Sequence, residues 1–424
     1  MVFEEIKILP QSIGAYRHLD KAGVKRAILA ATHLKGKRVF HINSTEKGGG
    51  VAEMLKGQVA LERSLKIDSR WLVIRPKEEF FQITKKIHNL LQGKAGFLSG
   101  KEQRAYLVES YRIAKSIVPF LKKNSPDLIV IHDPQPLVVG CEIPSEVPRI
   151  FRLHIDTSTP SANTIEFLRP FLERYNALIV SGDEYSPSWF SKKKIHVIMP
   201  SIDPFSEKNR RISVEEAREI LMQFNIHPDR PIIAQVSRFD PWKDPMGVID
   251  AYYRTKNKIP DLQLLLVGIF QAYDDPEALQ YFETVKRHAK GDPDIHLFSD
   301  PRRFVEIGND MFVNAVQTAS DVILQKSTRE GFGLTVTEAM WKGKAVIGGD
   351  ASGIRFQIKN GKDGFIVSDA KKASRLIIKL IKNPGLAAKI GKAAQKKVVK
   401  KFLRPRYIKE NLDAYNAVLK QNKK

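Results

Sequence analysis

Two carboxylates flank a pair of glycines in the second half of the sequence. Glu330 and Glu338 stand eight positions apart, with Gly331 and Gly333 between them, and a helical pattern covers residues 335–341. A helix that starts behind glycines offers backbone N–H groups to a phosphate, whereas carboxylates accept hydrogen bonds from sugar and ribose hydroxyls. The segment therefore predicts contacts to two hydroxylated groups on either side of a diphosphate. The alternative is a helix-capping acid and an acid on a helix surface.

Two basic residues share another loop. Arg238 and Lys243 are five positions apart, directly after an apolar run, in a loop closed by prolines. Two cations at the end of a strand suit a diphosphate leaving group, because they offset the charge that grows on it as the bond breaks. The alternative is a pair of solvated surface cations.

Three consecutive glycines follow the first apolar run. Gly48, Gly49 and Gly50 lead directly into a helical pattern, so their backbone could approach a phosphate or a sugar closely. The spacing is neither that of a dinucleotide fingerprint nor that of a Walker loop, and a plain tight turn is the alternative.

Short apolar runs that alternate with longer helical patterns must position these residues. The strand candidates are 38–43, 69–74, 128–133, 149–155 and 177–182 in the first half, and 231–240, 262–269, 294–300, 320–325, 344–349 and 363–367 in the second. This alternation predicts an α/β protein with two doubly wound parallel sheets, residues 1–205 and 206–404, joined by a linker rich in proline, serine and charge. In such sheets ligands lie beyond the carboxyl ends of the strands, so two facing sheets would share one cleft.

Composition excludes several classes of protein. Of the 424 residues, 42% are hydrophobic and 28% charged, as in a soluble globular chain, and no apolar run approaches the roughly 18 residues of a membrane span. The first residues lack the pattern of a signal peptide, so a cytoplasmic location is expected. Cys141 is the single cysteine, which excludes an intramolecular disulfide. The lysine-rich, cysteine-poor composition is compatible with a thermophilic source.

The formal charge of +23 is concentrated near the C-terminus. Residues 371–424 contain 17 Lys and Arg residues against 2 acidic ones, and their apolar residues recur at helical spacing. Amphipathic helices with a solvated lysine face are the first interpretation. Polyanion binding and attraction of anionic substrates are the alternatives, although nucleic-acid binding is disfavoured because residues 370–401 contain no interleaved aromatic residues to stack on bases.

The marked residues resemble a known family. The E-x7-E arrangement of Glu330 and Glu338, the upstream Arg238 and Lys243, and the early glycines look like the retaining glycosyltransferases of family 4 across essentially the whole chain. The segments 131–137 and 151–158 are similar to the branch that contains glycosyl-transferring trehalose synthase and trehalose phosphorylase. The resemblance implies the GT-B fold, in which two Rossmann-like domains face a central cleft. It also implies that the last helix, 405–424, crosses back to the N-terminal domain.

The resemblance implies roles for individual residues. Arg238 and Lys243 would hold the diphosphate, Glu330 the hydroxyls of the transferred glucose and Glu338 the ribose. His154 would lie against the donor sugar near the reacting carbon, with a purely structural histidine as the alternative. The predicted catalytic residues are His154, Arg238, Lys243 and Glu330. The predicted substrate-binding residues are Gly48, Gly49, Gly50, His132, Asp133, Gln135, Asp156, Gly331, Phe332, Gly333, Leu334, Thr335 and Glu338.

The expected reaction is transfer of glucose from ADP- or UDP-glucose to free glucose, giving α,α-trehalose with retention and in a reversible manner. The resemblance suggests front-face substitution, in which the leaving phosphate accepts the proton of the acceptor. No metal and no cofactor is expected. The partners are these small molecules, without nucleic acid or a membrane span, and a homodimer is compatible with the sequence. Trehalose phosphorylase, transfer to a sugar-phosphate or lipid-linked acceptor, and a non-catalytic polyanion-binding protein are the alternatives.

Overall fold

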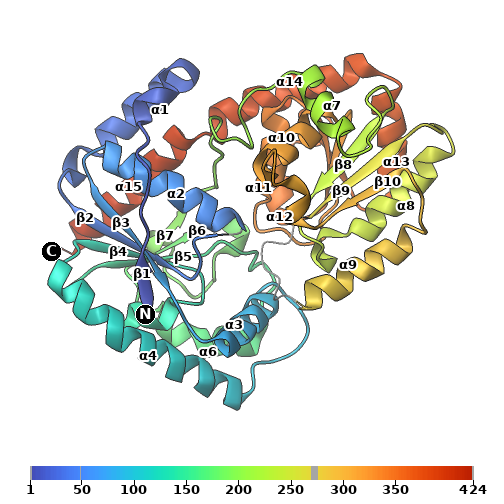
Figure 1. Cartoon of the computed structure of the whole chain (residues 1–424). Helices are drawn as coiled ribbons and strands as arrows, with labels where there is room; N and C mark the ends of the chain where they lie inside the picture. Colours follow the sequence, from blue (N-terminus) through green and yellow to red (C-terminus); the bar gives the residue numbers. More distant parts are fainter. Residues whose placement is uncertain (1, 48, 269–275, 423–424) are drawn as a thin grey trace. The chain divides into compact units, whose positions relative to one another are not determined.

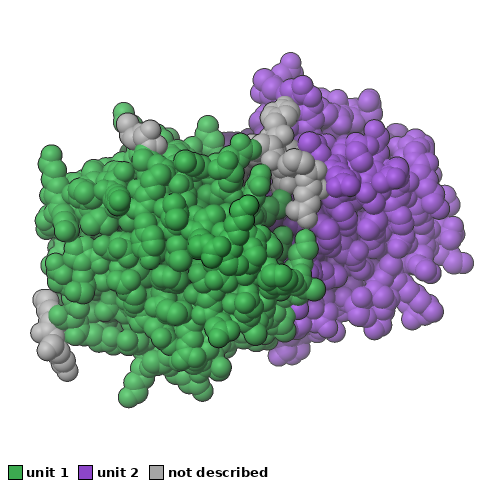
Figure 2. Space-filling model, turned by 90° about the horizontal axis from the view of Figure 1, so that it is seen from below, with its two compact units in different colours: residues 1–200, 404–424 green, residues 201–403 purple. Residues whose placement is uncertain are grey.

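The computed structural model describes residues 2–47, 49–268 and 276–422, which form two compact units (Figure 2). Unit 1 comprises residues 1–200 and 404–424, and unit 2 comprises residues 201–403. The chain therefore enters unit 2 after residue 200, where the sequence placed the boundary at 205. No helix within the described ranges is both long and apolar enough to cross a membrane.

Among the described residues, unit 1 has a seven-stranded sheet in the order β1-β3-β2-β4-β5-β6-β7 (Figure 1). All neighbouring strands are parallel except β1 and β3. Strands β4 and β5 are buried along their whole length, as expected for parallel strands covered on both faces. The strands are β1 (Phe3–Glu5), β2 (Arg38–Asn43), β3 (Asp68–Ile74), β4 (Leu128–His132), β5 (Arg149–Arg152), β6 (Ala177–Val180) and β7 (Ile195–Val197).

The last helix of the chain, α15 (Arg404–Gln421), belongs to unit 1. It packs against α1 and α2, and the Asn416 side chain donates to the Ala30 carbonyl over 2.9 Å. This contact confirms that the last helix returns to the N-terminal unit. The other helices of unit 1 are α1 (Arg17–Ala30), α2 (Gly49–Ser64), α3 (Glu78–Leu91), α4 (Gly100–Asn124), α5 (Leu137–Cys141) and α6 (Ala162–Leu172).

In the part of unit 2 that the structure describes, six parallel strands take the order β10-β9-β8-β11-β12-β13. The strands are β8 (Ile232–Val236), β9 (Gln263–Val267), β10 (Ile295–Phe298), β11 (Val322–Gln325), β12 (Ala345–Gly349) and β13 (Phe365–Val367). This is the Rossmann strand order, in which the direction of winding reverses between the first and the fourth strand. The switch point of unit 2 therefore lies between β8 and β11.

The helices of unit 2 bury apolar faces against this sheet. Leu264, Leu266, Val248 and Ile377 belong to one continuous core formed by β9, α8 and α13. The lysines of α13 and α14 are mostly exposed, which agrees with the predicted amphipathic helices. The helices are α7 (Val214–Met222), α8 (Pro245–Lys256), α9 (Pro276–His288), α10 (Asn309–Ala319), α11 (Leu334–Trp341), α12 (Ser352–Arg355), α13 (Ala370–Ile381) and α14 (Pro384–Lys401).

The predicted fold class, with two doubly wound sheets, is confirmed. The two strands that the sequence did not indicate, β1 and β7, have three residues each, too few to show a periodic pattern. Several predicted strands were too long. The strand predicted at 149–155 ends at Arg152, and that predicted at 231–240 ends at Val236. The residues beyond these ends enter the loops that carry the candidate site.

Candidate active site

The two loops that leave the switch point of unit 2 are tied to each other by hydrogen bonds. The side-chain amide of Gln235, in β8, donates to the Lys243 carbonyl over 2.9 Å and accepts from the Lys326 backbone N–H over 2.8 Å. The Thr328 N–H donates to the Trp242 carbonyl over 2.8 Å. The loop after β8 and the loop after β11 are therefore fixed relative to each other, and so are the side chains that they carry.

The structure brings Lys243 and Glu330 into direct contact. Lys243 Nζ lies 2.7 Å from Glu330 Oε2, and the two side chains are only 16% and 11% exposed. Ser327 Oγ donates to the same carboxylate oxygen over 3.3 Å. Because both ions are largely removed from water, each compensates the charge of the other. The sequence had assigned these residues to separate substrate groups and had not predicted their contact.

A second ion pair lies beside the first. Lys326 Nζ contacts the Asp244 carboxylate, and Asp244 also caps α8 by accepting from the Gly247 N–H over 3.0 Å. Neither Lys326 nor Asp244 was among the predicted residues. The sequence signal for Asp244 was its place directly before Pro245, the pattern of a helix N-terminus.

Arg238 lies in the same loop in a different environment. Its side chain is 74% exposed, and its guanidinium lies 3.6 Å from the Asp240 carboxylate. It is thus a largely solvated cation at the carboxyl edge of the sheet, whereas Lys243 is a largely buried one. The structure is compatible with a phosphate contact by Arg238, which stays a prediction.

The glycine turn before α11 is fixed by its surroundings. Gly333 has a φ of +82°, and a Cβ atom there would lie 3.0 Å from Glu330 Cγ. The Gly353 N–H donates to the Glu330 carbonyl over 3.0 Å, and the Gln357 amide donates to the carbonyls of Phe332 and Gly333. Phe332 is buried, while Leu334 and Thr335 are partly exposed in the first turn of α11. The turn that carries Glu330 is therefore rigid.

Glu338 has surroundings of its own on α11. It is 1% exposed, its Oε2 accepts a long hydrogen bond of 3.4 Å from Gln317, and its Oε1 lies 3.6 Å from Lys208 Nζ. The backbone carbonyl of Lys208 accepts a hydrogen bond of 2.8 Å from Lys342 Nζ. A role for Glu338 toward ribose stays a prediction.

In unit 1, Asp133 stands at the carboxyl end of β4 in an uncommon conformation. Its φ is +65°, which non-glycine residues adopt rarely and mostly at turns or functional sites. Its carboxylate is buried and accepts from the His154 backbone N–H over 2.9 Å. Burial raises the pKa of Asp133 to about 7. Asp133 can therefore exchange a proton near neutral pH.

His154 and His132 are joined to two residues that the sequence did not single out. His154 Nε2 lies 3.0 Å from His132 Nδ1, His132 Nε2 lies 3.1 Å from His41 Nδ1, and His41 Nε2 lies 3.0 Å from Glu62 Oε2. We call this row of four side chains the histidine chain. The available signal was polar residues in apolar patterns, since His41 interrupts a buried strand and Glu62 lies on the buried side of α2.

The remaining predicted residues of unit 1 have varied surroundings. The Asp156 carboxylate is buried and accepts from the backbone N–H and the hydroxyl of Ser158, an arrangement that supports its own turn. Gln135 is half-buried, and its Oε1 has no hydrogen-bond partner within the described ranges. Gly49, with a φ of +81°, and Gly50 begin α2, while Gly48 lies outside the described residues.

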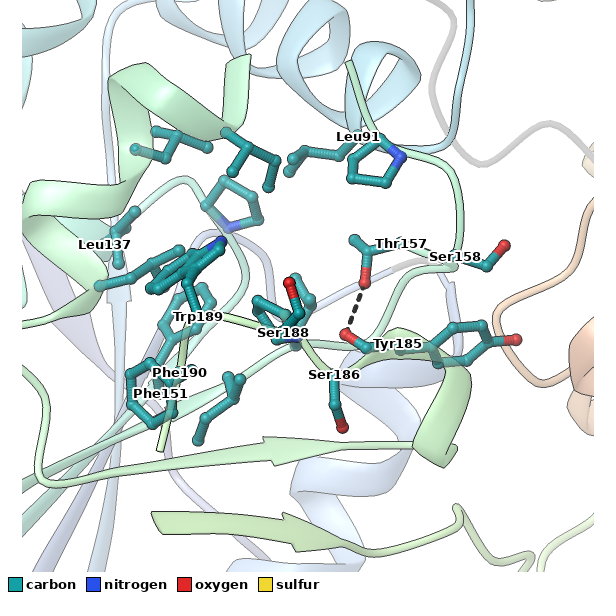
Figure 3. A pocket seen from close by; sticks show the side chains of 18 of the residues that line it. Leu91, Leu137, Phe151, Thr157, Ser158, Tyr185, Ser186, Ser188, Trp189 and Phe190 are labelled. Atoms are coloured by element: carbon teal, nitrogen blue, oxygen red, sulfur yellow. Dashed lines mark hydrogen bonds between the residues drawn. The ribbon is translucent and has the colours of Figure 1, made fainter. Parts of the chain in front are cut away.

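Unit 1 contains a pocket of about 270 Å³ (Figure 3). Leu137, Phe151, Trp189 and Phe190 give it a mainly apolar lining, and across it the Thr157 hydroxyl donates to the Tyr185 carbonyl over 2.9 Å. Sugar sites need convergent polar groups. The pocket therefore does not match a glucose site, and the polar groups around His154 and Asp133 are the better candidates.

Within the described part of the chain, no group of three or more His, Cys, Asp or Glu side chains is arranged to hold a metal ion. In the histidine chain the ring nitrogens approach one another at hydrogen-bonding distance. Metal independence stays a prediction.

Two Rossmann-like units, one of which holds a lysine and a glutamate in contact beside a glycine turn at its strand ends, have the architecture of a glycosyltransferase. The model "Glycosyl transferases group 1" matches residues 216–397, and the model "Trehalose synthase, N-terminal domain" matches residues 41–187. The trehalose synthase of Pyrococcus horikoshii is 44% identical over 92% of this chain and 92% of its own length, and that of Pyrococcus furiosus is 42% identical over 95% and 96%. The chain belongs to the trehalose synthase family.

A solved structure supports the fold independently. An α,α-trehalose-phosphate synthase from Burkholderia vietnamiensis superposes with a TM-score of 0.69, covering 92% of this chain and 100% of that one. Its sequence identity of 13% supports the fold alone.

Proposed function

We propose that this protein transfers glucose from a nucleoside-diphosphate glucose to free glucose, forming α,α-trehalose and releasing the nucleoside diphosphate. The observation that carries the proposal is the contact of Lys243 with Glu330 at the switch point of unit 2, in a chain of the trehalose synthase family. A cation for a diphosphate and a carboxylate for hydroxyls are thus held together where an open parallel sheet binds its ligands.

The donor would use the loops of unit 2. Lys243 and Arg238 offer positive charge to the diphosphate, which stabilises the charge that develops on the leaving group. Glu330 accepts hydrogen bonds from glucose hydroxyls, and Glu338 is the proposed ribose acceptor. When the donor binds, Lys243 exchanges part of its contact with Glu330 for contact with phosphate.

The acceptor would use the loops of unit 1. Asp133 and Gln135 present polar atoms at the carboxyl end of β4 as candidates for acceptor contacts, while His154, after β5, would lie against the donor sugar near the reacting carbon. In the proposed front-face reaction, the bond from the sugar carbon to the diphosphate breaks as the acceptor hydroxyl attacks from the same side. The hydroxyl proton passes to the leaving phosphate, so no protein nucleophile is required.

Metal independence is part of the proposal, because Lys243, Arg238 and backbone N–H groups supply the positive charge. Turnover should be unchanged in a chelator. Complete loss of turnover that magnesium restores would contradict this part.

The cytoplasmic location and the homodimer also stay predictions. Light scattering of the purified protein would decide the second.

Product analysis by NMR tests the function. Purified protein receives glucose with UDP-glucose or ADP-glucose in one reaction, and trehalose with inorganic phosphate in another. Trehalose from the first mixture is the expected result, and the faster nucleotide identifies the preferred base. Glucose 1-phosphate from the second mixture alone would replace the proposal with a trehalose phosphorylase. A third reaction offers a sugar phosphate in place of glucose. Glucosylation of the sugar phosphate but not of glucose would replace the proposal with the other acceptor class.

A further inference from the structure

Glu62 and His41 have no part in the reaction described above, yet both are fully buried. Glu62 lies on α2 and His41 on β2, which pairs with β4, the strand of His132. His154 follows β5, the neighbour of β4. The histidine chain thus crosses three adjacent strands, from the interior of unit 1 to the carboxyl edge of its sheet.

The rings in the chain meet edge to edge. The ring centroids of His132 and His154 are 5.3 Å apart with an interplanar angle of 16°, while their nearest nitrogens are 3.0 Å apart. Nearly coplanar rings in this arrangement share a hydrogen between nitrogens. His41 and His132 are tilted by 35° and share the next one.

Because each link contains one hydrogen, the state of one residue determines the others. Glu62, when ionised, can only accept, so His41 Nε2 donates to it. If His41 is neutral, its Nδ1 accepts from His132 Nε2–H, and His132 Nδ1 accepts from His154 Nε2–H. His154 Nδ1 is then an acceptor. If His41 carries a second proton, both links between the rings reverse, and His154 Nδ1 becomes a donor.

The charges differ between the two ends of the histidine chain. Burial alone would raise the pKa of Glu62, but His41, Ser69 and Gln58 outweigh it, and the pKa of Glu62 lies below its ordinary value. Burial holds the pKa of His132 and His154 well below the ordinary value.

Other charged and titratable groups act on the same residues. Arg152, buried on β5, adds to the lowering of the pKa at both His132 and His154, and His88 on α3 adds to it at His154. At the other end, the Tyr415 hydroxyl on α15 donates to Glu62 Oε1 over 3.2 Å. A positive charge is therefore disfavoured near Arg152 and favoured beside the Glu62 carboxylate.

We propose that Glu62 is a positioning residue that fixes, through His41 and His132, which nitrogen of His154 carries the proton. One proton taken up at His154 Nδ1 moves the Nε2 proton of His154 to His132 Nδ1. The Nε2 proton of His132 then moves to His41 Nδ1. The result is an imidazolium at His41 beside Glu62, with His132 and His154 neutral and His154 Nδ1 converted from acceptor to donor.

The consequence for catalysis rests on the proposed glucosyl transfer. His154 Nδ1 is buried and has no hydrogen-bond partner in the portion of the chain that the structure describes. As an acceptor it can take the hydrogen of a hydroxyl that reaches it, and as a donor it cannot. We expect the protein to be active when His41, His132 and His154 are all neutral. The rate of transfer should therefore fall on acidification, with the same midpoint pH as the reversal of the histidine chain.

The switch can be measured without activity. In the full-length protein labelled with ¹⁵N-histidine, long-range ¹H–¹⁵N spectra distinguish protonated from unprotonated ring nitrogens, and the spectrum of His154→Gln assigns the signals of His154. We expect Nε2 of His154 to be protonated above the midpoint and Nδ1 below it. In Glu62→Gln, which keeps the shape but removes the charge that stabilises the His41 imidazolium, the midpoint should fall by about one to three pH units. The acid limb of kcat/KM should move by the same amount.

The matched control is Tyr407→Phe. It removes a buried 2.9 Å hydrogen bond from the Tyr407 hydroxyl to Gln58, the residue that in turn contacts the Glu62 carboxylate. It should leave the midpoint in place. An unchanged midpoint in Glu62→Gln, or an equal shift in the control, would overturn the proposal. If Glu62→Gln does not fold, His41→Gln, which interrupts the chain, should abolish the two-state exchange at His154, and persistence of that exchange would be equally contrary. If the protein makes no trehalose but His154 still changes its protonated nitrogen with pH as expected, the proposed function is rejected and the proposal for the histidine chain stands.

Discussion

Replacing Glu330 by Gln should cost activity far more than stability. The change keeps the shape of the side chain and removes the partner of Lys243. Two unit charges 2.7 Å apart attract by about 6 kcal/mol at an effective dielectric constant of about 20. Dehydration of both ions offsets most of this attraction, and the 16% and 11% exposure leaves some solvent screening, so we expect a net coupling of about 1–3 kcal/mol. Glu330→Gln also removes a carboxylate that is proposed to accept a hydrogen bond from a hydroxyl of the transferred glucose, and this loss should lower kcat by about 10²–10³-fold.

A double-mutant cycle with Lys243→Met measures this coupling. Each single variant leaves one largely buried charge without its partner, whereas the double variant leaves none, so the double variant should be more stable to urea than the sum of the two single effects predicts. In kcat/KM the double variant should be no more active than the worse single variant, because both groups are proposed to bind the donor. Strict additivity in the unfolding measurement would refute the ion pair, and near-normal kcat in Glu330→Gln would refute its role in transfer.

Two further predictions concern the backbone conformation of glycines and the pKa of Asp133. Gly333→Ala places a side chain at a φ of +82° close to its neighbours and should lower both the unfolding temperature and kcat. Gly343→Ala has a similar φ of +72° but no atom within 4 Å of the added Cβ. It should therefore lower the free energy of unfolding by about 1–2 kcal/mol of strain, and with it the unfolding temperature, but leave kcat unchanged. Equal kcat for the two variants would contradict a special role of the turn. Because burial raises the pKa of Asp133 from 3.8 to about 7, the unfolded chain loses this proton first as pH rises. The free energy of unfolding of the wild type should therefore decline relative to Asp133→Asn between about pH 4 and pH 7, and parallel pH profiles would show that Asp133 is not perturbed.

The fold could be predicted because the strands of a covered parallel sheet are nearly continuous apolar runs. β2 and β4 show this pattern, and their predicted bounds agree with the structure to within a residue. The predicted ends failed where apolar residues continue past the sheet, as Leu153 does after β5, since a buried loop residue and a strand residue are equally apolar in sequence. The strand order of each sheet required the structure, because apolar runs do not specify neighbours.

In the candidate site, the sequence predicted several of the residues but not the contacts between them. The sequence marked Lys243 and Glu330 by their places after strands, but their contact depends on β8 and β11 being neighbours, which spacing along the chain does not contain. His41 and Glu62 passed unnoticed because a polar residue in an apolar pattern acquires meaning only when its partner is known. In both cases the sequence did not reveal which distant residues come into contact, although it did show the local pattern.

The contact of Lys243 with Glu330 also bears on how a strongly basic protein could keep the proposed donor site selective. A free ammonium group at the strand ends would attract any phosphate, but Lys243 is already compensated, so an anion must displace a carboxylate to reach it. A diphosphate brings more negative charge than a carboxylate and can do so, and the released Glu330 then accepts hydrogen bonds, which glucose hydroxyls provide and inorganic phosphate at neutral pH provides poorly. The pair thus favours a ligand that carries a diphosphate and a sugar together. Lys326 is held by Asp244 in the same way, which removes a competing cation from the same loops. We infer that the two ion pairs make binding of the intact donor more favourable than binding of its separate parts.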